Sequence, residues 1–184
     1  MDEAWEAGRH RDECQQPRGR SVPERSLHRA HRADGGLDWL DPFHGEEHGY
    51  AAFFAGVDAL AIGRGTYDTV LAFPEWPYGD KRLIVFTSRP GKPRRGEELW
   101  RGTPRALADR LDKEGVRRVY LDGGALIRSF LREDLVTELT LNLIPLVLGS
   151  GIPLFSSGLP EMPLRVVESK SYASGLVQIR YRRA

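Results

Sequence analysis

Two glycine-containing segments stand where a predicted strand gives way to a predicted helix. They are Gly63-Arg-Gly-Thr66 and, after Asp122, Gly123-Gly-Ala-Leu126. Glycines let a ligand approach the backbone closely, and the free N–H groups at a helix start favour an anion such as a pyrophosphate. The carboxyl ends of parallel strands meet at one edge of a sheet, where open α/β folds bind ligands. The pair predicts a nucleotide site, and the alternative is two tight turns that merely need small residues.

A third strand end adds a cation to this pattern. Thr87-Ser88-Arg89 follows another apolar run, and Arg89 has the planar guanidinium that forms bidentate contacts with phosphate. Its alternative role is that of a solvated loop residue. A full G-x-G-x-x-G with an acidic residue at the expected distance is missing, so the predicted dinucleotide site is not of the ordinary Rossmann type.

An aromatic and acidic segment, 34–43, precedes these junctions. Trp39 and Phe43 are candidates for stacking on a planar substrate, and Asp38 or Asp41 for hydrogen bonding to its nitrogens. The same residues also fit a hydrophobic staple and a helix cap ahead of a helix near Glu46.

One short motif suggests a metal. His44-Gly-Glu-Glu-His48 matches H-x-x-E-H, in which two histidines one helical turn apart hold zinc and the glutamate acts as base. Gly45 weakens the required helix, and no third ligand stands out. A zinc hydrolase is therefore kept only as an alternative function, and we expect no metal.

The elements that must position these residues alternate along the chain. Apolar runs predict strands at 57–63, 82–87 and 116–121, and helices at 66–73, 103–115 and 123–132. A further helix ends at Gly56, and Thr66 is a candidate N-cap. A long strand at 135–148 and a hairpin of 164–172 with 176–181, joined by Ala-Ser-Gly, complete the pattern. The order predicts an α/β fold with a mostly parallel sheet and a C-terminal antiparallel hairpin.

Composition limits the classes of function. The chain has 184 residues, 27 Lys+Arg against 26 Asp+Glu, and one cysteine, Cys14. This balance gives no support for a nucleic-acid partner, and no apolar stretch is long enough for a membrane span. The acidic start does not resemble a signal peptide, and the single cysteine cannot form an internal disulfide, so we expect a cytoplasmic protein.

Composition also divides the chain near residue 33. Residues 1–33 contain seven arginines, six acidic residues and three histidines, but their only large aliphatic residues are Val22 and Leu27. Because no apolar period is present, we expect an atypical, disordered arm at 1–33 and a single domain at 34–184.

The segments of this domain, taken in order, resemble the dihydrofolate reductase-like fold. The similarity is to the reductase domain of riboflavin biosynthesis (RibD C-terminal domain) and its small stand-alone relatives. The telling segments are Gly35–Leu40, Ile62–Tyr67, Val85–Arg89, Val119–Gly124 and Leu143–Phe155. The resemblance implies a three-layer fold and an NADPH-dependent reductase. Members of this fold often pair as homodimers, and the apolar strand Leu139–Leu148 is a candidate interface.

The resemblance also implies the site. The residues expected to contact NADPH are Gly63, Arg64, Gly65, Thr66, Ser88, Arg89, Gly123, Gly124, Ala125 and Leu126. The arginines would lie near the 2′-phosphate, and the double glycine near the pyrophosphate. Hydride would pass to a C=N or C=O carbon of a pterin-like or aminopyrimidine-ribose substrate, with Asp38 or an ordered water as proton donor. The alternative from another class is a nucleotide-binding protein without turnover.

The chain departs from the family before residue 34. Members begin with a buried strand and a turn like Ser-Leu-Asp-Gly-Phe-Ile-Ala, whereas this chain has the polar arm, so a central strand and part of the substrate pocket are expected to be absent. A shifted reading frame would explain the difference. Codons exist for Leu27-His-Arg-Ala30 whose +1 frame reads Phe-Ile-Ala, and codons for Val22-Pro-Glu-Arg25 can likewise give Ser-Leu-Ser-Gly.

This hypothesis predicts that the gene, read one frame away over residues 22–30, encodes an apolar strand and that turn. Sequencing the coding DNA tests it. If no small shift restores an apolar strand, the hypothesis is wrong.

Overall fold

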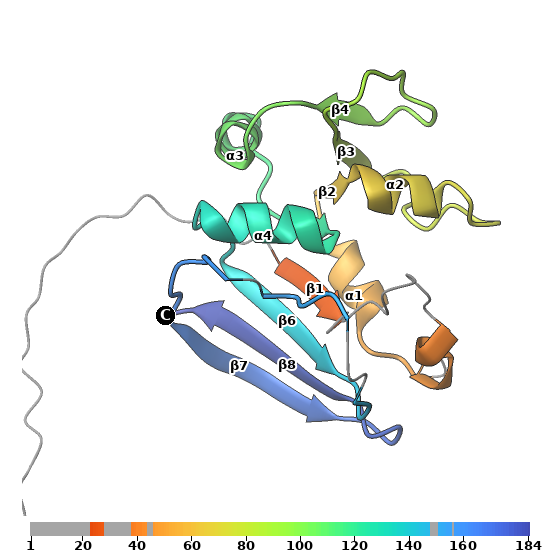
Figure 1. The fold of residues 1–184 in the computed structure, drawn as a ribbon, viewed down its shortest axis with the longest axis vertical. Coiled ribbons are helices and arrows are strands. Elements are labelled where there is room, and N and C mark those ends of the chain that lie inside the picture. Colours follow the sequence, from red (N-terminus) through yellow and green to blue (C-terminus); the bar gives the residue numbers. More distant parts are fainter. Residues whose placement is uncertain (1–22, 28–37, 44–45, 148–150, 156) are drawn as a thin grey trace, which may run out of the picture.

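The computed structural model describes residues 23–27, 38–43, 46–147, 151–155 and 157–184 (Figure 1). The helices are the 3-10 helix η1 (Asp38–Phe43) and the α-helices α1 (Tyr50–Ala55), α2 (Arg64–Val70), α3 (Pro104–Lys113) and α4 (Gly124–Arg132). The strands are β1 (Pro23–Leu27), β2 (Ala59–Gly63), β3 (Arg82–Phe86), β4 (Glu98–Trp100), β5 (Val119–Asp122), β6 (Glu138–Leu143), β7 (Leu164–Ser171) and β8 (Val177–Arg183).

The strands form two groups that β1 joins. One group has the order β4-β3-β2-β5 with every pairing parallel, and the other has the order β1-β6-β8-β7. β1 pairs in parallel with β6 and also contacts β5, whereas β8 is antiparallel to both β6 and β7. The prediction of an α/β fold with a parallel core and a C-terminal antiparallel hairpin is confirmed.

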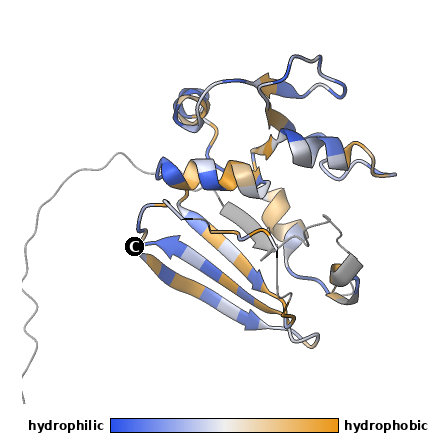
Figure 2. Cartoon of the chain, in the orientation of Figure 1, coloured by the Kyte–Doolittle hydropathy of each residue, from blue (hydrophilic) through white to orange (hydrophobic). Residues whose placement is uncertain are grey.

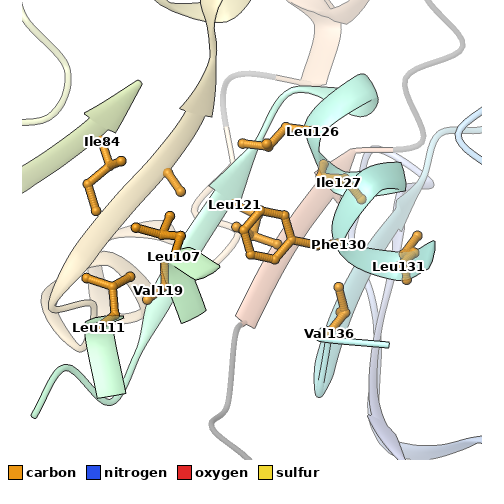
Figure 3. Close-up of a cluster of buried hydrophobic side chains, with 11 residues drawn as sticks. Ile84, Leu107, Leu111, Val119, Leu121, Leu126, Ile127, Phe130, Leu131 and Val136 are labelled. Carbon is orange, nitrogen blue, oxygen red and sulfur yellow. The ribbon is translucent and has the colours of Figure 1, made fainter. Parts of the chain in front are cut away.

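Helices cover both faces of the parallel strands, which gives three layers. On one face Ala61 and Ile84 pack with side chains of α3 and α4, including Leu107 and Phe130 (Figure 3). On the other face the neighbouring strand residues pack against Tyr67 of α2 and other aromatic side chains. Because both faces are buried, the strands are continuous apolar runs rather than alternating ones. None of the helices in the described residues is long and apolar enough to cross a membrane.

The expected helix at 103–115 is confirmed in detail. Pro104 occupies the first turn of α3, and the side chain of Thr103 accepts a hydrogen bond from the N–H of Ala106 at 3.2 Å. The expected N-cap of α2 is wrong. This helix begins at Arg64 after Gly63, which places Thr66 inside it. The helix begins two residues earlier than the spacing of the apolar residues predicted, directly after the glycine at position 63.

The structure also differs from the sequence-based expectation at two strands. The expected absence of a strand before residue 34 is wrong, because Pro23–Leu27 forms β1. Strand pairing uses backbone groups, so a segment without apolar alternation can still pair with β6. The three-residue strand β4 was not expected, since a segment this short shows no period.

The candidate dimer strand lies inside the sheet. β6 is flanked by β1 and β8, and Leu139 is 1% exposed, so this side chain serves the chain's own core. Large exposed apolar side chains occur at and beyond the strand's end, at Leu143, Leu146 and Val147. Figure 2 shows hydrophobic and more hydrophilic residues alternating along β6 itself. A homodimer stays a prediction, but Leu139 cannot be part of its interface.

A closed ring of four charged side chains fastens α3 to the parallel strands. Arg82 contacts Glu98 and Glu114, each at 2.6 Å, and Arg110 contacts the same two carboxylates at 2.6 and 2.7 Å. Hydrogen bonds from Arg82 and then Arg110 outweigh burial and hold the pKa of the Glu98 carboxyl below its ordinary value. The ring therefore stabilises the fold while Glu98 is ionised.

We predict that low pH removes the contribution of this ion ring to the stability of the fold. A carboxyl whose folded-state pKa is lowered stabilises the protein above its unfolded-state pKa, and the benefit is lost as the pH falls through the folded-state value. Glu98→Gln should cost about 1 kcal/mol of unfolding free energy at pH 7, the value of an exposed ion pair, and much less at pH 3. Urea unfolding at both pH values measures this, with Glu75→Gln in an exposed loop as control. An equal loss at both values would contradict it.

Candidate nucleotide-binding site

Three strand ends meet at one edge of the parallel sheet. The register aligns Gly63 of β2 with Phe86 of β3, and Ile62 with Asp122 of β5. The strands run in the same direction, so the segments that follow them emerge side by side. The structure thus brings together the three junctions that the sequence singled out: the one at 63–66, the one at 87–89 and the one at 122–126.

The first and last of these junctions are in close contact at Gly123. This residue has φ of +100°, a conformation that L side chains rarely adopt. A Cβ built on it would lie 2.6 Å from the hydroxyl oxygen of Thr66 and 3.6 Å from the backbone nitrogen of Gly63. The fold itself therefore requires glycine at position 123.

At two other positions, 65 and 124, the fold does not require glycine. Gly65 and Gly124 lie in the first turns of α2 and α4 without positive φ. A Cβ on Gly65 would meet no atom within 4 Å, and a Cβ on Gly124 would meet only the end of the flexible Arg128 side chain, at 3.3 Å. Glycine inside a helix costs about 0.5–1 kcal/mol relative to alanine. Bare backbone at these two positions fits a ligand that approaches it closely, such as a dinucleotide.

A cavity of about 270 Å³ opens beside this edge. It is lined by Arg64, Gly65, Asp68, Phe86, Thr87, Ser88 and Arg89. Arg64 is held by its Nε, which donates to a carboxylate oxygen of Asp68 at 2.8 Å. The Thr87 hydroxyl accepts a hydrogen bond from the N–H of Arg89 at 3.1 Å, which fixes the turn after β3. The cavity thus presents two guanidinium groups and one carboxylate, a surface suited to an anion.

Two α4 residues that were expected to contact NADPH differ in the exposure of their side chains. The side chain of Ala125 is exposed, whereas that of Leu126 is 6% exposed and packs in the hydrophobic core (Figure 3). Leu126 can therefore offer a ligand only its backbone. None of the residues 123–126 lines the cavity beside Arg64, so the expected contacts fall in two places along the same edge.

One polar pair at this edge was not expected from the sequence. Asp122 ends β5 directly before the double glycine, and its carboxylate accepts a hydrogen bond from the hydroxyl of Tyr78 at 3.3 Å. Tyr78 is 3% exposed and comes from the loop before β3. The position of an acid at a strand end was the available signal, but its partner is 44 residues away in the chain.

The expected substrate residues lie on η1. Asp38, Trp39 and Phe43 belong to this 3-10 helix rather than to a loop, and Phe43 is half-buried. The side chains of Asp38 and Trp39 lie outside the described part of the structure. Their contacts with substrate therefore stay predictions.

The zinc motif is described only in part, because His44 lies outside the described residues. Residues 46–49 precede α1 and are not helical, although the motif requires a helix. The hydroxyl of Ser174 donates a hydrogen bond to Glu46, and this bond holds the pKa of the carboxyl below its ordinary value. His48 packs edge-on against Tyr172, with ring centroids 4.7 Å apart. Glu46 and His48 thus join this segment to the β7–β8 turn.

Known proteins share both the sequence pattern and the fold. The RibD C-terminal domain profile matches residues 50–178. The uncharacterized protein YwjB of Bacillus subtilis is 39% identical over 157 residues, which cover 83% of this chain and 90% of YwjB. A second uncharacterized protein of that organism, YyaP, is 28% identical over 163 residues, which cover 80% of this chain and 85% of YyaP.

Solved structures agree. The crystal structure of a putative riboflavin biosynthesis protein from Shewanella sp. PV-4 has a TM-score of 0.77 at 30% identity, and the match covers 89% of this chain and 96% of that one. A diaminohydroxyphosphoribosylaminopyrimidine deaminase/5-amino-6-(5-phosphoribosylamino)uracil reductase from Thermotoga maritima has a TM-score of 0.65 at 13% identity. The match covers 90% of this chain and 57% of the Thermotoga chain, and it shows a shared fold.

The glycines at this edge should respond differently to alanine. We predict that Gly123→Ala costs about 1–3 kcal/mol of unfolding free energy, because its φ and the contact with Thr66 both exclude a side chain. Gly65→Ala should keep or raise the stability, because its Cβ has open space in a helix. Urea unfolding of both variants measures the difference. Equal losses would show that the two positions are constrained alike.

Proposed function

The chain belongs to the RibD C-terminal domain family, and from that membership we propose that it is an NADPH-dependent reductase. Its substrate would be pterin-like or an aminopyrimidine-ribose, reduced at a C=N or C=O carbon. One observation of the structure carries the proposal: the fold does not require glycine at positions 65 and 124, whereas close approach of a dinucleotide does.

The residues proposed to bind the cofactor form two groups, uncharged backbone N–H groups and charged arginine side chains. Backbone N–H groups at the start of α4, at Gly124 and Ala125, would hold the pyrophosphate. Arg64 and Arg89, which line the cavity, would hold the 2′-phosphate, because guanidinium groups bind phosphate oxygens in pairs. Arg64 is already oriented by Asp68, so little side-chain freedom is lost on binding.

The bound cofactor would supply the hydride. The chain's own contribution would be to orient the two reactants and to exclude water from between them. A proton must reach the reduced substrate at the neighbouring nitrogen or oxygen, and we propose Asp38, or a water molecule held near it, as the donor. Trp39 and Phe43 on the same short helix would stack on the planar ring of the substrate.

We expect the bare backbone at Gly124 to be needed for NADPH. Titration of the protein with NADPH, followed by fluorescence, should show saturable binding that Gly124→Ala weakens at least about tenfold and Gly124→Asp abolishes. The introduced carboxylate would repel the pyrophosphate. Arg132→Ala, at the exposed end of the same helix, is the matched control and should leave the affinity unchanged.

The outcomes separate the candidate functions. Binding followed by NADPH oxidation with dihydropterin or aminopyrimidine substrates supports the reductase. Binding without oxidation across such substrates supports a nucleotide-binding protein without turnover. If the folded wild-type protein binds no NADPH, the proposal is wrong.

A further inference from the structure

A buried carboxylate lies beneath the basic loop between β3 and β4. Glu97 is 4% exposed and accepts hydrogen bonds from the N–H groups of Arg94 and Arg95, each at 2.8 Å. It also accepts a hydrogen bond from the hydroxyl of Tyr67 on α2, a side chain that is 2% exposed. One side chain thus fastens the loop at 90–96 to helix α2.

The protonation states match this role. Burial alone would raise the pKa of Glu97, but the hydrogen bonds from Tyr67 and the two backbone N–H groups outweigh it and lower the pKa below its ordinary value. Burial, and then the bond to Glu97, raise the pKa of Tyr67 to about 12. Near neutral pH the pair is therefore a carboxylate that accepts from a neutral phenol, which is the stronger, charge-assisted form of this bond.

The same loop borders the cationic cavity. A Cβ built on Gly91 would lie 3.6 Å from Nη1 of Arg64, which is ordinary contact distance, so the loop backbone lies against that guanidinium. Arg64 also lies over the ring of Tyr67, 5.9 Å from its centroid. Its position is thus defined by Asp68, by the ring of Tyr67 and by the loop that Glu97 holds.

A second contact holds the far side of the loop. The guanidinium of Arg95 lies 4.9 Å from the centroid of the Trp76 ring. This cation–π contact and the bonds to Glu97 together restrain a segment that carries three cations, at Lys92, Arg94 and Arg95. Without the carboxylate, mutual repulsion of these cations would favour other loop conformations.

We propose that Tyr67 and Glu97 are positioning residues that hold Arg64 and the loop at 90–96 in the arrangement that binds the 2′-phosphate of NADPH, and so set the preference for NADPH over NADH. This inference rests on the proposed function. NADH lacks that phosphate, so its affinity depends on the rest of the site. Loss of the pair should therefore affect NADPH much more than NADH.

The test compares the two cofactors in wild type, Tyr67→Phe and Glu97→Gln by fluorescence titration. We expect Kd for NADPH to rise about tenfold in each variant, the value of one charge-assisted hydrogen bond, and Kd for NADH to change less than about twofold. Glu98→Gln is the matched control, because it alters the neighbouring carboxylate and destabilises the fold through the ion ring instead. It should leave the ratio of the two Kd values unchanged.

A second measurement reports on the loop directly. Hydrogen exchange at the amides of Arg94 and Arg95 should accelerate in Glu97→Gln and stay near wild type in Glu98→Gln. If Glu97→Gln does not fold, Tyr67→Phe still decides, because it removes one hydroxyl and keeps the ring in the core.

The negative outcomes are distinct. If the folded variants keep the wild-type ratio of NADPH to NADH affinity, or weaken both cofactors equally, the positioning role is wrong while the proposed function stands. If wild type binds neither cofactor, both the positioning role and the proposed function are wrong.

Discussion

The close approach of two strand-to-helix junctions at Gly123 is the constraint on which the candidate site at this edge of the parallel sheet depends. The positive φ of Gly123 turns the chain from β5 into α4 at a point where a side chain would collide with Thr66 of α2. The two junctions are therefore one packed unit. With β3 paired beside β2, this unit also fixes where the turn at 87–89 emerges, because parallel pairing leaves little freedom in register.

The glycines at this edge look alike in the sequence but differ in physical origin. Gly123 is required by backbone geometry and by a neighbouring atom, whereas a Cβ would have open space at Gly65 and would meet only the flexible end of Arg128 at Gly124. Sequence patterns can locate all three, since glycine after an apolar run indicates a strand-to-helix junction. They cannot separate a glycine that the fold needs from one that a ligand needs, because that distinction depends on atoms from another element.

The same limit explains what the sequence did and did not predict. Strong apolar runs such as Val57–Gly63 and the Thr103-Pro104 helix start carry local signals, so the parallel core and α3 were predicted. The Tyr67–Glu97 pair joins residues 30 positions apart, and a lone glutamate after a basic loop has no local signature. β1 was missed because Pro23–Leu27 shows no apolar alternation, although its backbone groups pair with β6.

Charge at the proposed site is governed by pairing rather than by composition. The chain carries a formal net charge of +1, too little to draw an anion to one place. Locally, Asp68 holds Arg64, while Glu97 is buried beneath the loop that borders it. Each carboxylate removes some positive charge yet fixes where the remaining charge lies. A guanidinium that is already oriented loses less conformational freedom when it binds phosphate. This preorganisation offsets the affinity lost because the carboxylates reduce the local positive charge. In the proposed site the orientation of the cations, more than their number, would decide which nucleotide is preferred.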